Sequence, residues 1–494
     1  MTWREYHDAT KHSPDSLRRN EDEPLDWANM PDPFRHYEGV PVLDLPADPP
    51  APQVPALDVL KGEAGVPADV DGAGFLSQLL FHAAAISATK RVPAADFEYA
   101  LRVNPSSGNL HPTEFHFATR GLKNWPDGLY HYRPSSHMAE QRALGDFTER
   151  LIGEPASLVF ILTSIAWREA WKYRERAYRY CLHDVGHAWE ALALSAKASG
   201  CESFAWGHFS DEEVTKTCRL HDDEWPMLLV RLSGDGLPVA RPDGGNETWF
   251  EGRPNRLSEV PIAYPLIEGI QSATRYITYR NAPRPAPAVS GSGAISLPES
   301  AWSPQSFGRV ARKRRSALNF TGPPSITLAE LSALLEVTAQ PYLADFAGSR
   351  FVQLYLYAHR IEGLAQGVYR YWPQGNSLEL VRSGDQKVMI AGLSLGQSLA
   401  GNACVAFSMI GDLERAVRAN GDRGYRYVHM EAGAIGHRLY VAAEALGLGA
   451  TGIGAFFDDD VNRYLDLSEG PGSYGQVVYH FAVGHPVPDP RIGA

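Results

Sequence analysis

The chain has 494 residues, 44% hydrophobic and 21% charged, which is typical of a globular protein with a sizeable core. Its net charge of −12 argues against a nucleic-acid partner, because binding phosphate backbones requires a basic surface. We find no apolar run that could span a membrane and no secretory signal. The cysteines (Cys181, Cys201, Cys218 and Cys404) lack CxxC spacing, which favours reduced thiols in a cytoplasmic protein.

The sequence contains an internal repeat. The motif Tyr-Arg-Tyr at 178–180 recurs 247 positions later at 425–427, and the same offset relates several glycines without a gap. Two further motifs recur upstream in the same order: LSQLL at 76–80 and LSALL at 331–335, then GLYHYRP at 128–134 and GVYRYWP at 367–373. Because the pieces keep their order, we predict one domain written twice.

Each copy predicts the same order of elements. A helix over the LSxLL motif is followed by a strand, the GxYxY hairpin, a second strand, a long helix, a glycine turn and a last strand. The expected ranges are 114–119, 157–163, 178–198 and 227–232 in the first copy, and 351–357, 403–410, 425–446 and 476–483 in the second. Helices and strands interleave without a regular βαβ rhythm, so the sequence predicts an α+β fold.

Composition suggests where the domains begin and end. Residues 1–70 are rich in proline and charge and predict an N-terminal extension that wraps over the surface. The first domain is expected at 71–245 and the second at 301–494, with a linker at 246–300. Within that linker, the Pro-, Gly- and Ser-rich stretch 282–293 forms neither a helix nor a central strand.

Two patterns resemble known binding motifs, but we predict that neither forms the site that its motif suggests. Residues 447–452 match the dinucleotide fingerprint GxGxxG, but a helix precedes them where a Rossmann site requires a strand. Gly447 instead fits the left-handed position that ends a helix. His183 and His187 share a helix face, but no third ligand with suitable spacing follows, so we predict no metal site.

Several motifs together resemble those of FMN-dependent nitroreductases. Arg314–Ser316 resembles their Arg-x-Ser opening, Pro105–Asn109 (PSSGN) their PSSxN loop, and Thr451–Gly454 (TGIG) their glycine turn. Lys172 and Tyr173 precede the first YRY motif. With them, the motif sequences are most similar to those of the SagB/ThcOx-type dehydrogenases, which include azoline oxidases of peptide natural products. The resemblance implies two tandem nitroreductase-like domains that form an intramolecular pseudo-dimer.

The two copies differ in ways that predict one flavin site. In the family, one subunit supplies the Arg-x-Ser opening and the glycine turn, and the other supplies the PSSxN loop. Here only the second copy has the opening, and only the first has the loop. Where the second copy has Gly449 and Gly452, the first has Glu202 and Ala205, whose side chains would obstruct a flavin. We therefore predict a single FMN between the halves.

The resemblance also implies roles for individual residues. Arg314, Arg315 and Ser316 would bind the FMN phosphate, and Arg491 near the C-terminus would reach the same group. The other predicted cofactor-binding residues are Pro105, Ser106, Ser107 and Asn109 at the ribityl chain and pyrimidine edge, Gln397 at the pyrimidine side, and Gly452, Ile453 and Gly454 near flavin N5. Relatives often carry a basic residue where this chain has Leu318.

Lys172 and Tyr173 are the predicted catalytic pair. A lysine beside a phenol favours the phenolate, and a tyrosinate could accept a proton from the substrate while a hydride passes to the flavin. The matching positions of the second copy hold Ala419 and Asn420. The alternative is an interface tyrosine beside a lysine whose stem lies along apolar surface.

The sequence thus predicts an FMN-dependent oxidoreductase that transfers a hydride between flavin N5 and a small-molecule or peptide substrate. Two alternatives stay open: an NAD(P)H-dependent nitroreductase or flavin reductase, and a non-catalytic scaffold of a biosynthetic complex. The sequence also leaves open whether NAD(P)H binds and whether the chain forms a homo-oligomer.

Overall fold

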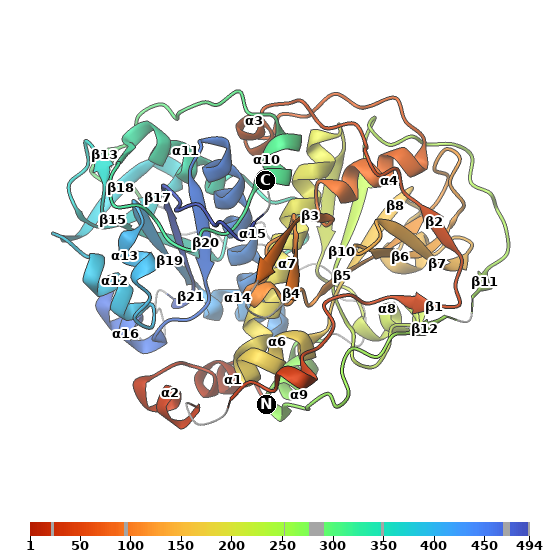
Figure 1. Ribbon diagram of the computed structural model, residues 1–494, viewed down its shortest axis with the longest axis horizontal. Coiled ribbons are helices and arrows are strands. Elements are labelled where there is room, and N and C mark those ends of the chain that lie inside the picture. Colours follow the sequence, from red (N-terminus) through yellow and green to blue (C-terminus); the bar gives the residue numbers. More distant parts are fainter. Residues whose placement is uncertain are drawn as a thin grey trace.

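The structure is a computed structural model that describes residues 1–20, 24–92, 97–250, 252–275, 291–346, 350–467 and 475–492. It has two similar halves side by side, each with an antiparallel sheet and a long helix at the interface between them (Figure 1). The α+β prediction is therefore confirmed. Residues 282–290 of the predicted linker lie outside the described residues.

The two sheets have six matching strands in the same order. It is β7-β6-β5-β8-β10-β9 in the first half and β18-β17-β15-β19-β21-β20 in the second; beyond them, β2 and β11 pair with β7, and β13 pairs with β18. The first sheet comprises β2 (Val42–Asp44), β5 (Thr113–Thr119), β6 (Gly128–Arg133), β7 (Met138–Leu144), β8 (Leu158–Ser164), β9 (Glu202–Trp206), β10 (Trp225–Ser233) and β11 (Thr248–Trp249). The second comprises β13 (Ile295–Ser296), β15 (Val352–Ala358), β17 (Gly367–Trp372), β18 (Ser377–Ser383), β19 (Val405–Gly411), β20 (Gly449–Ile453) and β21 (Gln476–Gly484). The matching order confirms the repeat.

Short pairings and helices complete each half. The pairings join β1 (Tyr37–Glu38) to β12 (Arg253–Pro254), β3 (Ile86–Val92) to β4 (Phe97–Arg102), and β14 (Ile326–Thr327) to β16 (Ile361–Glu362). The helices are α1 (Trp3–Ala9), α2 (Pro14–Asn20), α3 (Ala56–Leu60), α4 (Gly72–Phe81), α5 (Thr148–Ile152), α6 (Ala166–Tyr173), α7 (Ala177–Ala198), α8 (Asp211–Cys218), α9 (Pro265–Thr274), α10 (Phe307–Lys313), α11 (Leu328–Ala339), α12 (Lys387–Leu393), α13 (Ser398–Asn402), α14 (Leu413–Asn420), α15 (Gly424–Ala445) and α16 (Asp458–Tyr464). None of these described helices combines the length and hydropathy that a membrane crossing requires.

The long helices α7 and α15 form the centre of the interface. They cross at glycine, because a Cβ added at Gly186 would lie 2.1 Å from the carbonyl oxygen of Met430. Symmetrically, a Cβ at Gly433 would lie 2.1 Å from the carbonyl oxygen of His183. Only glycine allows the two backbones to approach so closely, which explains why both glycines recur at the repeat offset.

The N-terminal segment belongs to the repeat and is not a separate arm. Helix α3 pairs with α10 about a pseudo-twofold axis: Ala56 N–H donates to the Gln305 carbonyl oxygen (2.9 Å), and Phe307 N–H donates to that of Val54 (2.8 Å). Helices α1 and α9 also occupy matching places, side by side at the bottom of the view (Figure 1). The predicted boundaries at 70 and 300 therefore divide structural units that the chain contains twice.

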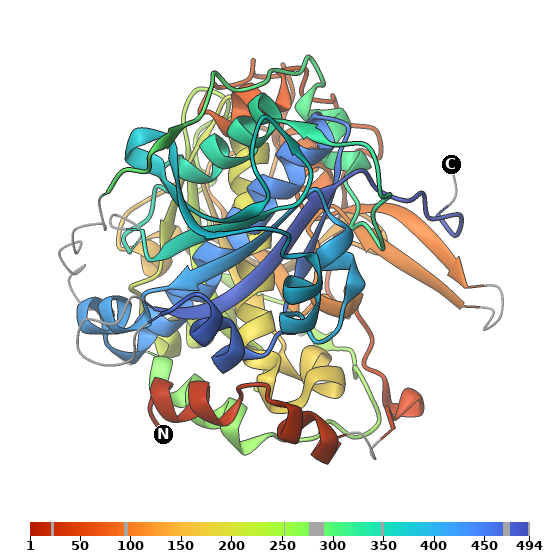
Figure 2. The same cartoon turned by 90° about the vertical axis from the view of Figure 1, so that its left-hand side faces the viewer.

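A protruding hairpin and an edge strand were not expected. The β3–β4 hairpin extends away from the body of the molecule, next to the C-terminal segment (Figure 2). The predicted glycine turn is largely the edge strand β20, paired with β21. Gly447 has φ +74°, as expected for the left-handed residue that follows α15.

Candidate active site

A cavity of about 670 Å³ lies between the halves. Its lining includes these predicted residues: Pro105, Ser106, Ser107, Asn109, Tyr173, Arg314, Arg315, Ser316, Gln397, Gly452, Ile453, Gly454 and Arg491. Lys172 is not part of the lining; its Nζ lies 5.2 Å from the centre of the Tyr173 ring. The structure thus brings together segments that are more than 200 residues apart in sequence.

One end of the cavity is strongly cationic. Arg314 is 4% exposed and donates to the carbonyl oxygens of Val103 (3.0 Å) and Arg102 (3.2 Å). Arg315 donates to the carbonyl oxygen of Ser87 on β3 (2.8 Å). Burial lowers the pKa of Arg314 to about 10, so its guanidinium is still charged at neutral pH.

These arginines keep donors that the protein does not use. Within the described ranges, buried Nη1 of Arg314, Nε of Arg315, and Nε and Nη1 of Arg102 have no hydrogen-bond partner. No carboxylate in that part of the chain forms an ion pair with any of the three. A buried cation without a counter-charge is costly, so the donor set fits an anionic group such as a phosphate.

Arg491 lies at the rim and not in the buried pocket. Its side chain is 43% exposed and pairs with Asp489 (2.8 Å), which also pairs with Lys90 on β3 (2.7 Å). The N–H of Arg91 donates to the carbonyl oxygen of Arg491 (3.1 Å), so the C-terminal segment is attached to the β3–β4 hairpin. Arg491 therefore adds positive charge at the entrance.

The PSSGN loop is held by its own side chains. Ser107 donates to Asp184 from its N–H (3.1 Å) and from Oγ (3.0 Å). Asn109 Nδ2 donates to the carbonyl oxygen of Ala100 (3.0 Å), and its Oδ1 lies 3.0 Å from His111 Nε2. Asn109 itself has φ +61°, a conformation that asparagine tolerates better than most residues. These polar groups fix the shape of the loop as well as lining the cavity.

The expected effect of Lys172 on Tyr173 is wrong. The pKa of Tyr173 is raised well above its usual value, first by burial and then by Glu169, Tyr180 and Asp184. Tyr173 is therefore a neutral phenol at physiological pH and not a tyrosinate. Its hydroxyl lies beneath the loop, where a Cβ added at Gly108 would be 2.7 Å away.

The glycine segment forms the opposite wall. Gly452 N–H donates to the Tyr440 hydroxyl (2.9 Å), which also hydrogen bonds Ser316 Oγ (2.8 Å). A Cβ at Gly452 would lie 1.9 Å from the Tyr479 hydroxyl, and one at Gly449 would lie 2.6 Å from Pro486 Cβ. Close contacts within the protein are therefore enough to require glycine at both positions. This reason differs from the one expected from the sequence, namely that side chains there would obstruct a flavin.

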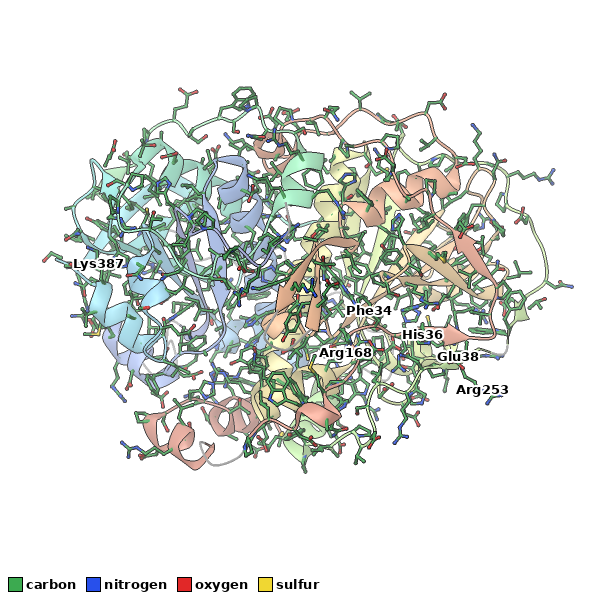
Figure 3. The ribbon with its side chains drawn as sticks, in the orientation of Figure 1. Phe34, His36, Glu38, Arg168, Arg253 and Lys387 are labelled. Atoms are coloured by element: carbon green, nitrogen blue, oxygen red, sulfur yellow. The ribbon has the colours of Figure 1, made fainter. Side chains whose placement is uncertain are left out.

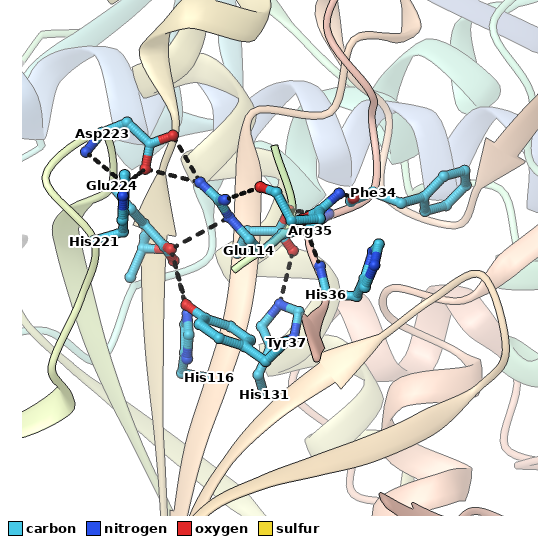
Figure 4. Close-up of polar contacts among 12 residues, drawn as sticks. Phe34, Arg35, His36, Tyr37, Glu114, His116, His131, His221, Asp223 and Glu224 are labelled. Carbon is cyan, nitrogen blue, oxygen red and sulfur yellow. Dashed lines mark hydrogen bonds and ion pairs between the residues drawn. The ribbon is translucent and has the colours of Figure 1, made fainter. Parts of the chain in front are cut away.

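Buried charges support the loop from behind. Arg168 on α6 donates to the carbonyl oxygen of His111 (2.7 Å) and to Glu114 Oε1 (2.5 Å). His131 Nε2 lies 3.1 Å from the other Glu114 oxygen (Figure 4). Burial alone would raise the pKa of Glu114, but Arg168 and His131 lower it to about 2. The carboxylate therefore stays ionised and holds the end of the loop.

The N-terminal segment closes this network. Arg35 forms a 2.7 Å ion pair with Asp223 beside it (Figure 4). The Arg102 guanidinium lies over Phe34, 4.9 Å from the centre of its ring. Figure 3 labels Phe34 and Arg168 near the middle of the view and Lys387 at the outer edge of the second half. Arg168 Nε donates to the carbonyl oxygen of Asp32 (2.9 Å). Residues near 30–40 therefore contribute to the position of the loop.

The histidines of α7 pack in the helix crossing. His183 stacks on Tyr479 with ring centres 4.3 Å apart, and burial lowers its pKa well below the usual range. His187 Nε2 lies 3.2 Å from the Tyr479 hydroxyl. Across the described residues, no group of three or more His, Cys, Asp or Glu side chains is placed to hold a metal ion.

The pseudo-symmetric position across the interface is filled by the chain itself. Ala205 N–H donates to the carbonyl oxygen of Leu343 (2.8 Å), and the Asp345 carboxylate accepts from the N–H groups of Gly207 (2.7 Å) and His208 (3.0 Å). Ala205 and Gly207 are the repeat counterparts of Gly452 and Gly454. We call residues 342–346 the plug. They accept hydrogen bonds from the N–H groups of Ala205 and Gly207, whose counterparts Gly452 and Gly454 line the cavity.

The plugged position lacks the cationic opening in its sequence. The α3–α10 pairing relates residues 251 positions apart, and continuing this offset aligns the exposed Glu63 with the buried Arg314, and Gly65 with Ser316. The first half therefore has no counterpart of the arginine that lines the cavity.

Several lining residues were missed by sequence reasoning. They are Lys90, Tyr99, Arg102, His111, Tyr180, Asp184, His187, Tyr440, Tyr479 and Asp489. The repeat offers a signal for two of them: Tyr180 matches Tyr427 in the YRY motif, and Asp184 matches Glu431, so both copies keep an acid there. Lys90, Tyr99 and Arg102 come from the β3–β4 hairpin, which has no recurring motif in the second copy.

Comparisons with known proteins agree with this geometry. The sequence model described as the nitroreductase family matches residues 85–234 and 311–485. A protein of Methanocaldococcus jannaschii described as a nitroreductase is 34% identical over 173 residues, which are 33% of this chain and 85% of that protein. The microcin B17-processing protein McbC of Escherichia coli is 30% identical over 149 residues, 27% of this chain and 54% of McbC. A crystal structure from Anabaena variabilis, described as a nitroreductase, has a TM-score of 0.77 and 27% identity, covering 98% of this chain and 99% of its own.

Proposed function

The chain belongs to the nitroreductase family, and on that premise we propose that it is an FMN-dependent oxidoreductase of the SagB type with one FMN between its halves. When bound, FMN supplies two-electron chemistry by exchanging a hydride at N5. The observation that carries the proposal is the set of unused, buried guanidinium donors at a cavity built by both halves. A phosphate dianion offsets the charge that these donors leave uncompensated.

The lining residues divide into three groups by what they offer. Arg314 and Arg315 hold the phosphate, with Arg491 at the rim. The loop 105–109 offers polar side chains and backbone to the ribityl chain and the pyrimidine edge, with Gln397 nearby. The segment 452–454 offers a wall with little side-chain bulk, which suits a flat ring system.

We propose a peptide or another small organic molecule as the substrate. The similarity to a protein that processes microcin B17 supports a peptide. The cavity opens beside the exposed Leu318 and the C-terminal segment, so a substrate can approach past the β3–β4 hairpin.

Purified protein reconstituted with FMN is expected to retain one FMN per chain. The plug excludes a second FMN, because Asp345 occupies the backbone donors of the matching position. Flavin absorbance against protein concentration measures the ratio. A ratio of two would contradict the single site, and protein that stays colourless would overturn the proposed function. Bleaching of the bound flavin by NADPH would identify the reductase alternative.

Replacing Tyr173 with phenylalanine is expected to leave FMN affinity within about 3-fold and to lower turnover by about 10²–10⁴, the range for removing one proton-transfer group. The phenol lines the cavity and stays protonated, so it can donate a hydrogen bond or a proton. Steady-state kinetics at saturating FMN measures the effect. Unchanged turnover would make Tyr173 a packing residue.

A further inference from the structure

Two carboxyl groups lie together beneath the PSSGN loop. Glu169 on α6 is fully buried, and its carboxyl group faces Asp184 and the Ser106 hydroxyl. Asp184 on α7 is 2% exposed, accepts two hydrogen bonds from Ser107, and lines the cavity. An acid buried behind a second acid at the wall of a cavity, with no ion pair to a cation among the described residues, calls for a chemical explanation.

The surroundings do not neutralise two negative charges. Helix α6 contributes Lys172 and Tyr173, helix α7 contributes Tyr180 and Cys181, and the loop contributes the hydroxyls of Ser106 and Ser107. Burial raises the pKa of Glu169 well above its usual range, Asp184 raises it further, and Lys172 and Ser106 oppose this only in part. Burial also raises the pKa of Asp184 to about 7, against the hydrogen bonds from the two serines.

The second half shows which of these acids is needed for structure. Glu431 is the repeat counterpart of Asp184, and it accepts from the N–H groups of Phe351 (2.9 Å) and Val352 (3.0 Å). One carboxylate on the long helix therefore holds, in each half, the earlier segment that leads into the sheet: the PSSGN loop before β5, and the start of β15. The counterpart of Glu169 is Ala416, so the second acid is present only in the half that has the PSSGN loop.

We propose that Glu169 and Asp184 share one proton near neutral pH and act as the proton acceptor of the active site, with Asp184 as the group that meets the substrate. The proposal rests on the proposed function. On oxidation the substrate loses a hydride to the flavin and a proton from a neighbouring atom, and so gains a double bond. The broken bond to hydrogen is replaced by an O–H bond on Asp184, and the pair passes from one proton to two until solvent removes the extra proton.

The first test needs no flavin. Infrared spectra of the FMN-free protein at about pH 8, where free carboxyl groups are ionised, are expected to contain the carbonyl stretch of a buried protonated acid. The band that disappears in Glu169→Gln but remains in Glu431→Gln belongs to the pair. Spectra of native protein and Glu169→Gln without such a difference would overturn the proposal, whatever the protein binds.

The second test uses the pH dependence of turnover in the FMN-loaded enzyme. Native turnover is expected to fall on acidification, because the pair fills with protons and can accept no more. In Glu169→Gln, Asp184 loses its acidic neighbour and gains an amide donor, so this acid limb should move at least about 1 pH unit lower. Glu431→Gln should leave the limb in place. A limb that stays fixed in Glu169→Gln while kcat falls would show that Glu169 only supports the loop.

The Asp184→Asn variant tests the proton acceptor itself. Asparagine Oδ1 can still accept from Ser107, so the loop and FMN affinity are expected to persist, whereas turnover should fall by about 10²–10⁴. Native turnover in this variant would exclude Asp184 as acceptor. Loss of FMN binding in native protein, with the infrared difference intact, would instead count against the proposed function alone.

Discussion

Arg314→Ala is expected to weaken FMN binding by about 2–5 kcal/mol, at least about 30-fold in Kd, as for other buried charge pairs that lose one partner. Arg314 is 4% exposed, and one of its guanidinium nitrogens is unused. Little water reaches this position, so each charge-assisted hydrogen bond to the phosphate counts for more than it would at the surface. Titration of FMN-free protein followed by flavin fluorescence measures the loss.

Lys313→Ala is the matched control. Lys313 belongs to the same basic run, but its side chain is 65% exposed and pairs with Glu444 (2.8 Å). It should bind FMN like the native protein. Addition of FMN should raise the unfolding midpoint of the native protein and of Lys313→Ala, and of Arg314→Ala only at much higher concentration. Native affinity in Arg314→Ala would mean that the phosphate binds elsewhere.

The repeat and its asymmetry could be predicted because short sequence motifs reveal both. The YRY and GxYxY motifs recur in order, and the observed strands β5, β8, β15 and β19 each begin within two residues of the expected ranges. The opening Arg314–Ser316 occurs once and the PSSGN loop occurs once. In a pseudo-dimer, a cofactor site needs the opening from one half and the loop from the other half. Because the second half has the opening and the first half has the loop, the sequence predicted on which side of the interface the cavity forms.

Features that depend on long-range packing could not be predicted. The pKa of Tyr173 depends on burial and on Glu169 and Asp184, and the adjacent Lys172 does not overcome them. The plug at 342–346 has no motif, since its effect comes from one carboxylate, Asp345, placed on two N–H groups of the other half. A proline- and charge-rich composition indicated a surface extension, but α1 and α3 are parts of the folded unit.

The proposed single site agrees with what each half contributes to the interface. In both halves the long helix carries an acid that holds a loop, Asp184 or Glu431. The first half adds Glu169 and Tyr173 beside that acid, and the second half supplies the arginines opposite. On the other side of the interface the plug satisfies the donors that a ligand would use. The cavity lies on one side of the interface, while the contacts of the plug hold the halves together on the other side.

Asp458→Asn and Asp211→Asn are each expected to destabilise the protein by about 3–5 kcal/mol, the usual cost of breaking a buried ion pair. Asp458 on α16 pairs across the interface with Arg176 (2.9 Å) and Arg179 (2.8 Å) of the first half. Asp211 on α8 pairs in the same way with Arg423 and Arg426 of the second half. Each variant leaves two buried guanidinium groups without their charge partner. Chemical denaturation, followed by far-UV circular dichroism, measures the shift in midpoint.

The two variants should differ at the active site, which makes each the control of the other. Arg176 Nε also donates to the Tyr180 hydroxyl (3.1 Å), which donates to the carbonyl oxygen of Gly454 in the cavity wall (3.1 Å). Asp458→Asn should therefore weaken FMN binding as well as stability, whereas Asp211→Asn, next to the plug, should weaken stability alone. Equal effects on FMN affinity would show that the Arg176–Tyr180 contact does not shape the wall.

The pH dependence of stability gives an independent check on Asp458. Burial alone would raise its pKa, but Arg176 and Arg179 lower it below the ordinary value. A carboxyl whose pKa is depressed on folding contributes stability above its unfolded pKa, and this contribution is lost as the pH falls through the folded pKa. Native protein should therefore lose stability below about pH 4, and Asp458→Asn should lose less over the same interval. If both proteins lost the same stability on acidification, the ion pair across the interface would not stabilise the association of the two halves.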